Sequence, residues 1–192
     1  MSTEKIVFLS GKKTILRPVF REDIPYLLKW INDPDVRQFV ASIFPTTQKF
    51  EEDWVDGLGK DKDNIVVVIE TKEGKPIGLM GLHRIDWVNR LATTGALIGD
   101  KEYWGKGFGT DAKMALLDYA FNTLNLNRIN SDVIAFNERS LNYSLHCGYQ
   151  VEGRKRQAMF RHGKYWDRIE LGLLREEWLP LWEKYRETGS LQ

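Results

Sequence analysis

Residues 98–112 read IGDKEYWGKGFGTDA, and this stretch decides the fold. Three glycines at alternate positions, Gly105, Gly107 and Gly109, join the predicted end of a strand to the predicted start of a helix. Glycine adopts positive φ freely and leaves no Cβ between the backbone amides and a ligand. Because the first N–H groups of a helix lack partners and lie at its positive end, the loop suits a phosphate group.

Two familiar phosphate-binding loops do not match this spacing. A Walker loop requires G-x-x-x-x-G-K-[ST], and the dinucleotide fingerprint requires G-x-G-x-x-G, whereas this loop is G-x-G-x-G. Taken alone, the loop leaves two interpretations open, an anion site or a glycine-rich turn without a ligand.

The hydrophobic pattern around the loop predicts strands interrupted by helices. Alternating and β-branched runs predict strands over residues 13–19, 65–69, 76–86, 92–99, 130–136, 149–160 and 164–174. Helical spacing predicts helices over residues 21–32, 36–40, 47–58, 109–122, 138–146 and 178–185. This order implies a mixed α/β (α+β) fold, with a mostly antiparallel sheet of about seven strands and helices on both faces.

Composition limits the classes of partner. The chain has 192 residues, of which 42% are hydrophobic and 29% charged, which is typical of one globular domain. Its 28 basic residues nearly balance 27 acidic ones, which argues against nucleic acid or an anionic membrane as the main partner. No apolar run is long enough for a signal peptide or a membrane span, so we expect a cytoplasmic protein. Cys147, the single cysteine, reads as a small buried hydrophobe.

Residues 98–112 resemble motif A of the GNAT family of N-acetyltransferases. Further along, Asn137-Glu138-Arg139-Ser140 and Cys147-Gly148-Tyr149 resemble that family's N-x-x-S and x-G-[FY] segment. Residues 16–18 with 22–23, and residues 163–167, resemble the branch that contains ribosomal-protein N-terminal and spermidine acetyltransferases. The resemblance runs from about residue 12 to 183, so it implies one acetyltransferase domain over 1–192, with acetyl-CoA as co-substrate and no metal.

The resemblance also implies where acetyl-CoA binds. In that family the strand before the loop separates from its parallel neighbour, and pantetheine pairs with the exposed strand backbone while the loop amides hold the pyrophosphate. The implied cofactor-binding residues are Leu97, Ile98, Gly99, Trp104, Gly105, Lys106, Gly107, Phe108, Gly109, Thr110, Asn137, Arg139 and Ser140. Two of them have a second interpretation, Asn137 as a helix N-cap and Lys106 as a solvated loop lysine.

The proton-transfer groups of the family are less well matched. Where many members carry a tyrosine that protonates the leaving thiolate, this chain has Ser144, and Tyr143 is turned away from that position by about 100°. Ser144 is therefore a weaker donor or a small packing residue. Where many members carry a glutamate base, this chain has Thr93, so His83, Asp86 and Asp167 remain as candidate bases, with a structural histidine and a turn cap as the alternatives for the first two.

The implied reaction is direct attack of a neutral amine on the thioester, through a tetrahedral intermediate stabilised by a backbone N–H near Ile98. The acceptor is a protein N-terminal α-amine, a polyamine or another small amine. Acidic residues that would attract it, or form a solvated helix face, are Asp33, Asp35, Glu51, Glu52 and Asp53. Aromatic residues that would wall the cleft are Phe44, Trp54, Trp87 and Trp166. A non-catalytic acetyl-CoA sensor is the alternative function, and the sequence leaves open whether the chain forms a homodimer.

Overall fold

The computed structural model describes residues 6–191 and builds them around one eight-stranded sheet, with strand order β1-β2-β3-β4-β5-β6-β8-β7. All neighbouring strands are antiparallel except β5 and β6. The strands are β1 (Leu9–Ser10), β2 (Thr14–Pro18), β3 (Ile65–Thr71), β4 (Pro76–Asp86), β5 (Leu91–Ile98), β6 (Arg128–Ile134), β7 (Gln150–Arg161) and β8 (Lys164–Leu174). The predicted mixed, mostly antiparallel sheet is confirmed.

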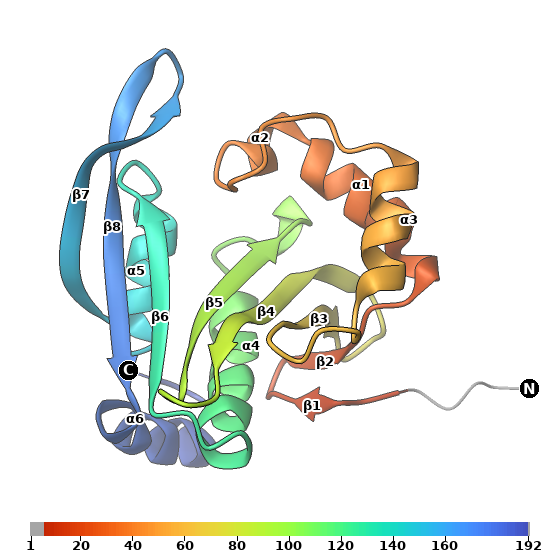
Figure 1. Ribbon diagram of the computed structural model, residues 1–192. Helices are drawn as coiled ribbons and strands as arrows, with labels where there is room; N and C mark the ends of the chain where they lie inside the picture. Colours follow the sequence, from red (N-terminus) through yellow and green to blue (C-terminus); the bar gives the residue numbers. More distant parts are fainter. Residues whose placement is uncertain (1–5, 192) are drawn as a thin grey trace, which may run out of the picture.

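The parallel pair is short, and the two strands then diverge. Parallel pairing starts at Leu91 with Arg128 and ends at Thr93 with Asn130. Beyond that point β5 continues to Ile98 without a strand partner on its β6 side, while β6 stays paired with β8. In Figure 1 the sheet opens at this place like a V, with β6, β8 and β7 on one side and β5 and β4 on the other. The predicted splayed pair is therefore present.

Helices cover both faces of the sheet (Figure 1). They are α1 (Ile24–Asn32), α2 (Pro34–Arg37), α3 (Gln48–Gly57), α4 (Phe108–Asp118), α5 (Glu138–His146) and α6 (Arg175–Thr188). Leu27 of α1 and Val55 of α3 pack with Leu79 on one face of β4. The next residue, Met80, points to the other face and joins the main core with Leu116 of α4. The split between β5 and β6 thus opens between two helical layers.

Three details differ from the sequence prediction. The sheet has eight strands instead of about seven, because β1 is only two residues long and too short for an alternating pattern. The helix predicted around Val36 to Val40 ends at Arg37. The helix predicted over 109–122 is α-helical to Asp118 and continues as a π-helical turn, Tyr119–Thr123. Within residues 6–191, no helix combines the length and apolar character needed to cross a membrane.

Candidate active site

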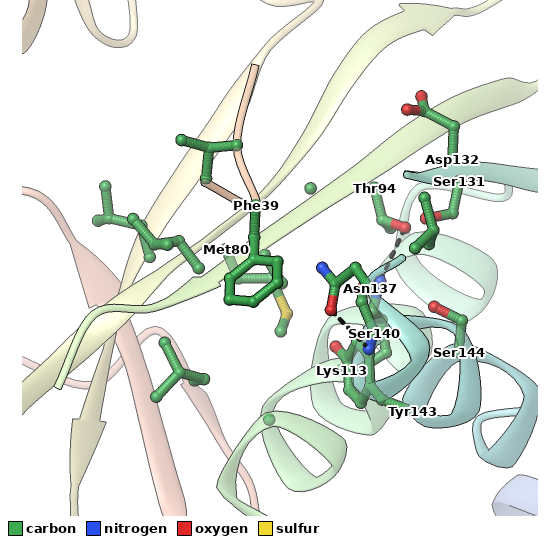
Figure 2. A pocket seen from close by; sticks show the side chains of 18 of the residues that line it. Phe39, Met80, Thr94, Lys113, Ser131, Asp132, Asn137, Ser140, Tyr143 and Ser144 are labelled. Atoms are coloured by element: carbon green, nitrogen blue, oxygen red, sulfur yellow. Dashed lines mark hydrogen bonds between the residues drawn. The ribbon is translucent and has the colours of Figure 1, made fainter. Parts of the chain in front are cut away.

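A cavity of about 850 Å³ fills the split between β5 and β6. Its two strand walls are residues 93–98 of β5 and residues 131–134 of β6. On one face of the sheet the cavity extends under α3, and this part is called the α3 side. On the other face it extends between α4 and α5, and this part is called the α4 side. Figure 2 shows Phe39 and Met80 facing Asn137 and Ser140 across this space.

The backbone of β5 presents alternate residues to the split. Gly99 N–H donates to Ile77 O on β4 at 2.9 Å, so alternation along the strand turns the amides of Leu97 and Gly99 toward β4 and those of Ala96 and Ile98 toward β6. The Ile98 N–H is therefore available to an extended ligand, whereas the Ile98 carbonyl accepts from Trp104 Nε1 at 2.7 Å. The backbone groups of Leu97 and Gly99 face β4, although Leu97 still lines the cavity, so contact of these two residues with the cofactor stays a prediction.

The glycine loop ends at the N-terminus of α4, as the sequence predicted. Gly107 is the N-cap residue with φ of 83°, and Gly105 has φ of 71°, a left-handed conformation that costs a non-glycine residue about 1–2 kcal/mol. Asp111 N–H is bonded to Gly107 O at 3.0 Å, which leaves the three amides of residues 108–110 without partners in the helix. Gly105, Gly107, Gly109 and Thr110 all line the cavity.

Three predicted cofactor contacts lie outside the cavity lining. Lys106 is exposed, and its carbonyl accepts a hydrogen bond from Lys13 Nζ at 3.1 Å. Phe108 packs edge-on against Tyr103, with ring centroids 5.0 Å apart. Gly99 leaves room for the Trp30 ring, because a Cβ at residue 99 would lie 2.1 Å from Trp30 Cγ. The side chains of Lys106 and Phe108 and the position of Gly99 thus serve the loop and the packing around it.

Lys13, which sequence reasoning did not single out, brings a positive charge to the same loop. Its Nζ lies 5.9 Å from the Phe108 ring centroid and 3.3 Å from where a Cβ of Gly107 would stand. A lysine ammonium next to unpaired helix amides is an arrangement suited to a phosphate. Lys13 lies at the start of β2, and nothing in its local sequence marks it.

An aromatic and cationic wall stands next to the loop. Trp104 Nε1 donates to Ile98 O at 2.7 Å, which fixes the indole at the end of β5. The Arg139 guanidinium stacks on this ring at 3.8 Å and lies 5.2 Å from Phe39. Burial lowers the pKa of Arg139 below its usual value. Trp104 and Arg139 both line the cavity. Where the family often has a polar residue, this chain has a tryptophan whose ring holds the arginine.

Helix α5 contributes polar groups to the opposite wall. Asn137 is its N-cap, with Oδ1 accepting from Ser140 N–H at 3.1 Å, and this confirms the predicted cap. Figure 2 shows the amide nitrogen of Asn137 pointing away from this bond and into the cavity. Ser144 is 1% exposed and lines the cavity, as does Tyr143, whose buried hydroxyl has no hydrogen-bond partner. Burial raises the pKa of Tyr143 well above 10.

His83 is the candidate base that the structure places in the cavity. It lies on β4 opposite Thr93, and its imidazole covers Gly81 and Gly95, which pair with each other. A Cβ on either glycine would come within 2.9 Å or 3.3 Å of His83 Nε2, so the absence of side chains makes room for the ring. Burial and the nearby charge of Arg84 lower the pKa of His83 below 6.5, which keeps it neutral at neutral pH.

The other two candidate bases have structural roles. Asp86 caps the turn after β4, with Oδ1 accepting from the N–H groups of Val88 and Asn89 at 3.0 and 2.8 Å. These bonds lower its pKa below 3.8. Asp167 accepts from Gln157 N–H and Arg154, each at 2.9 Å, and its pKa is also lowered. Neither residue lines the cavity, so the interpretation of Asp86 as a catalytic base is not retained.

The acidic residues expected to attract a cationic acceptor also lie elsewhere. Asp33 and Asp35 both bind Lys101 Nζ, at 2.9 and 2.7 Å. None of the five acidic residues named from the sequence lines the cavity, and of the four aromatic residues only Trp54 does. The single carboxylate in the lining formed by the described chain is Asp132, which binds Arg168 at 2.5 Å.

Two buried charged residues of α4 were missed from the sequence. Asp111 is 1% exposed and accepts five hydrogen bonds, from the backbone N–H groups of residues 12–14, from Thr14 Oγ1 and from Tyr185 Oη. Lys113 is also 1% exposed, and it lines the cavity. Lys113 precedes Leu116 and Leu117 by three and four residues, so it belongs to the buried face of the helix. Because lysine is charged, the hydrophobic pattern of the sequence did not include it.

The split strands, the glycine-capped helix and the cavity between them define a protein that binds an acyl-CoA and transfers its acyl group. The chain belongs to the GNAT acetyltransferase family, since residues 13–150 match the model of an acetyltransferase (GNAT) domain. It is therefore an enzyme that transfers the acetyl group of acetyl-CoA to an amine, and the sensor alternative is set aside. No group of three or more His, Cys, Asp and Glu side chains that could hold a metal ion is found in residues 6–191.

Relatives and solved structures agree with this assignment. The chain is 30% identical over 172 residues to the spermidine N(1)-acetyltransferase of Escherichia coli K12, covering 88% of this chain and 90% of the relative. It is 31% identical to an uncharacterized N-acetyltransferase, p20, of Bacillus licheniformis, covering 88% and 97%. The crystal structure of spermidine N-acetyltransferase from Vibrio cholerae with CoA and spermine superposes with a TM-score of 0.82 at 25% identity, covering 88% and 99%.

Proposed function

We propose that this enzyme acetylates a weakly basic primary amine, the α-amine of a peptide or protein N-terminus. The observation that carries this proposal is the charge of the cavity. Its lining holds Arg84, Lys113, Arg139 and Arg168, against one carboxylate that is already paired. An acceptor with several ammonium groups would meet uncompensated positive charge there.

The lack of a carboxylate base supports the same acceptor. An α-amine has a pKa of about 8 and an alkyl amine about 10, so at pH 7 the neutral fraction is about one tenth for the first and below one thousandth for the second. His83 is neutral at neutral pH and lies on the α3 side, among the apolar residues Val66, Leu79 and Trp54. A neutral imidazole is a sufficient base for an α-amine.

The cofactor would then lie in the split. The amides of residues 108–110 and Lys13 hold the pyrophosphate, Asn137 Nδ2 and the Ile98 backbone hold pantetheine, and the thioester reaches the apex where β5 and β6 meet. The amine approaches from the α3 side, loses a proton to His83 and attacks the thioester carbon. The Ala96 N–H, which faces the split two residues from Thr94, stabilises the oxyanion of the tetrahedral intermediate. On collapse, the carbon–sulfur bond breaks and CoA leaves as a thiol after taking up a proton.

The acceptor is tested by thiol release from acetyl-CoA with matched amines. A peptide that lacks lysine, the same peptide with a blocked N-terminus, and spermidine are compared. We expect kcat/KM for the free peptide to exceed that for spermidine at least tenfold, with no turnover of the blocked peptide and with the acetyl group on the α-amine by fragment mass spectrometry. A higher kcat/KM for spermidine would refute the α-amine assignment.

The role of His83 is tested with the variant His83→Gln and the peptide acceptor. The neutral imidazole is the active form, and its pKa lies below 6.5. Wild-type activity should therefore persist as the pH falls toward 6.5 and decline only below the lowered pKa. The variant should lose about 100-fold in kcat/KM and should show no such acid limb. A variant within threefold of wild type would exclude His83 as the base.

Spermidine is the second candidate acceptor. The relatives favour it, since both the Escherichia coli and the Vibrio cholerae protein are spermidine acetyltransferases. In this chain, however, the acidic residues of the α1–α3 region are paired with lysines or lie outside the cavity lining.

A further inference from the structure

A buried lysine lies at the apex of the split. Lys113 Nζ donates to Thr94 Oγ1 at 2.8 Å (Figure 2). Thr94 is the first β5 residue after the last parallel pair, Thr93 with Asn130, and its hydroxyl also contacts Asn130 O at 3.4 Å. Lys113 is thus fixed at the point where the two strands separate, which is the closed end of the cleft.

Within residues 6–191, the charge of Lys113 has no acidic partner. Tyr143 of α5 and Tyr149, which precedes β7, present their rings at 5.3 and 5.2 Å, and Thr94 of β5 is neutral. The remaining neighbour, Cys147 of α5, stays a neutral thiol because burial raises its pKa to about 12. No second hydrogen bond to Lys113 Nζ is found in the described chain, so two of its three donors are free. An unpaired ammonium at this depth is costly and calls for a functional account.

We propose that Lys113 is the acid that protonates the thiolate of CoA. This inference rests on the proposed position of acetyl-CoA in the split, with its thioester at the apex. When the tetrahedral intermediate collapses, the carbon–sulfur bond breaks and its electron pair goes to sulfur. A proton moves from Lys113 Nζ to sulfur, and the neutral amine of Lys113 regains a proton from solvent before the next turnover.

The properties of Lys113 fit this step better than those of Ser144. Burial lowers the pKa of Lys113 from 10.5 to about 8, close to that of a thiol at about 8.5, and proton transfer is efficient between groups of matched pKa. The positive charge also stabilises the developing thiolate before the proton moves. Ser144 has neither a charge nor a hydrogen-bonded base beside it in the described chain, so its hydroxyl can act only by relaying a proton.

The test uses steady-state kinetics of Lys113→Met, Lys113→Arg and Ser144→Ala. It is run with whichever acceptor, peptide or spermidine, turns over faster, so the outcome does not depend on the acceptor assignment. With saturating acceptor, we expect Lys113→Met to lower kcat at least 100-fold while the Kd for CoA, from calorimetry, changes less than threefold. Wild-type kcat should decline above pH 8 as Lys113 loses its proton, and Lys113→Met should lack this limb. Lys113→Arg should also be slow, because arginine does not release a proton near pH 8.

Three outcomes would overturn the proposal. If Lys113→Met retains kcat within threefold while Ser144→Ala loses 100-fold, Ser144 is the acid. If Lys113→Met loses CoA affinity and keeps kcat, Lys113 binds the cofactor. If intact mass shows one acetyl group on Lys113 after incubation with acetyl-CoA, the residue is a nucleophile. A wrong cofactor placement is recognised separately. In that case, variants of the glycine loop bind CoA with the same Kd as wild type.

Discussion

Replacing Lys113 with methionine should make the folded protein more stable. The side chain is 1% exposed, and burial lowers its pKa from 10.5 to about 8. Keeping the ammonium inside the protein therefore costs about 3 kcal/mol of folding free energy at neutral pH. Methionine has a similar length and no charge, and it fills irregular apolar sites well. The variant loses the bond to Thr94, worth about 1 kcal/mol, but Thr94 Oγ1 keeps its contact with Tyr149 Oη at 2.9 Å.

The net gain should be about 2 kcal/mol at pH 7, and it should fade as the pH rises. Because the folded-state pKa of Lys113 is the lower one, the unfolded chain binds more protons between pH 8 and 10.5, so wild-type stability rises with pH in that window. At pH 9.5 the cost of burying the charge falls to about 1 kcal/mol, so the variant and wild type should then be about equally stable.

Urea unfolding at pH 7 and pH 9.5 measures both numbers. Lys184→Met is the matched control, because Lys184 also lies within a helix but is exposed, and lysine and methionine have similar helix propensities. The control should change the free energy of unfolding by less than about 0.5 kcal/mol at either pH. A Lys113→Met protein less stable than wild type at pH 7, or an equal difference at both pH values, would show that Lys113 is not buried as a charge.

Two further substitutions test the glycine loop and the support of α4. Gly109→Ala places a methyl group among the unpaired amides of α4, 3.5 Å from Tyr143 and without a strained φ, so we expect the Kd for CoA to rise at least tenfold. The control Gly57→Ala, in open space on α3, should leave the Kd for CoA unchanged. If Gly109→Ala and wild type have equal Kd values for CoA, the pyrophosphate does not bind at this loop. Asp111→Asn should lower the free energy of unfolding by about 3 kcal/mol, since a neutral amide cannot accept five hydrogen bonds. Chemical denaturation at pH 7 measures the loss, and a change below about 1 kcal/mol would contradict the role of Asp111 in joining β2, α4 and α6.

The parts of the site that follow from local backbone geometry were predictable from the sequence. A glycine at the αL N-cap of a helix and an asparagine cap are properties of a few neighbouring residues, so the sequence around Gly107 and Asn137 predicts both. The parallel pair and its separation followed from the order of strands and the resemblance to the family. These features depend little on which distant segment packs against them.

The residues that the sequence did not predict depend on long-range contacts. Lys13, immediately before β2, reaches the glycine loop through a contact with Lys106, 93 residues away. His83 could not be assigned to a face, because one register shift between His83 and Asp86 and the Gly81–Gly95 pair decide where its ring lies. In each case the deciding contact is with a residue far away in the sequence, or with a glycine whose missing side chain leaves room for another residue.

Lys113 shows why the proton-handling groups are the hardest to predict. Motif comparison tests whether a tyrosine occupies the position of Ser144. Because this chain has a serine there, motif comparison identifies no acid. The chemistry requires only a donor of suitable pKa that reaches the sulfur at the apex of the split, and residues of α4 line the cavity as residues of α5 do. A lysine that α4 buries against Thr94, with tyrosine rings instead of carboxylates around it, acquires through burial the acidity that the missing tyrosine would have supplied. The same burial destabilises the fold, so the stability gained and the activity lost in Lys113→Met should come from one cause.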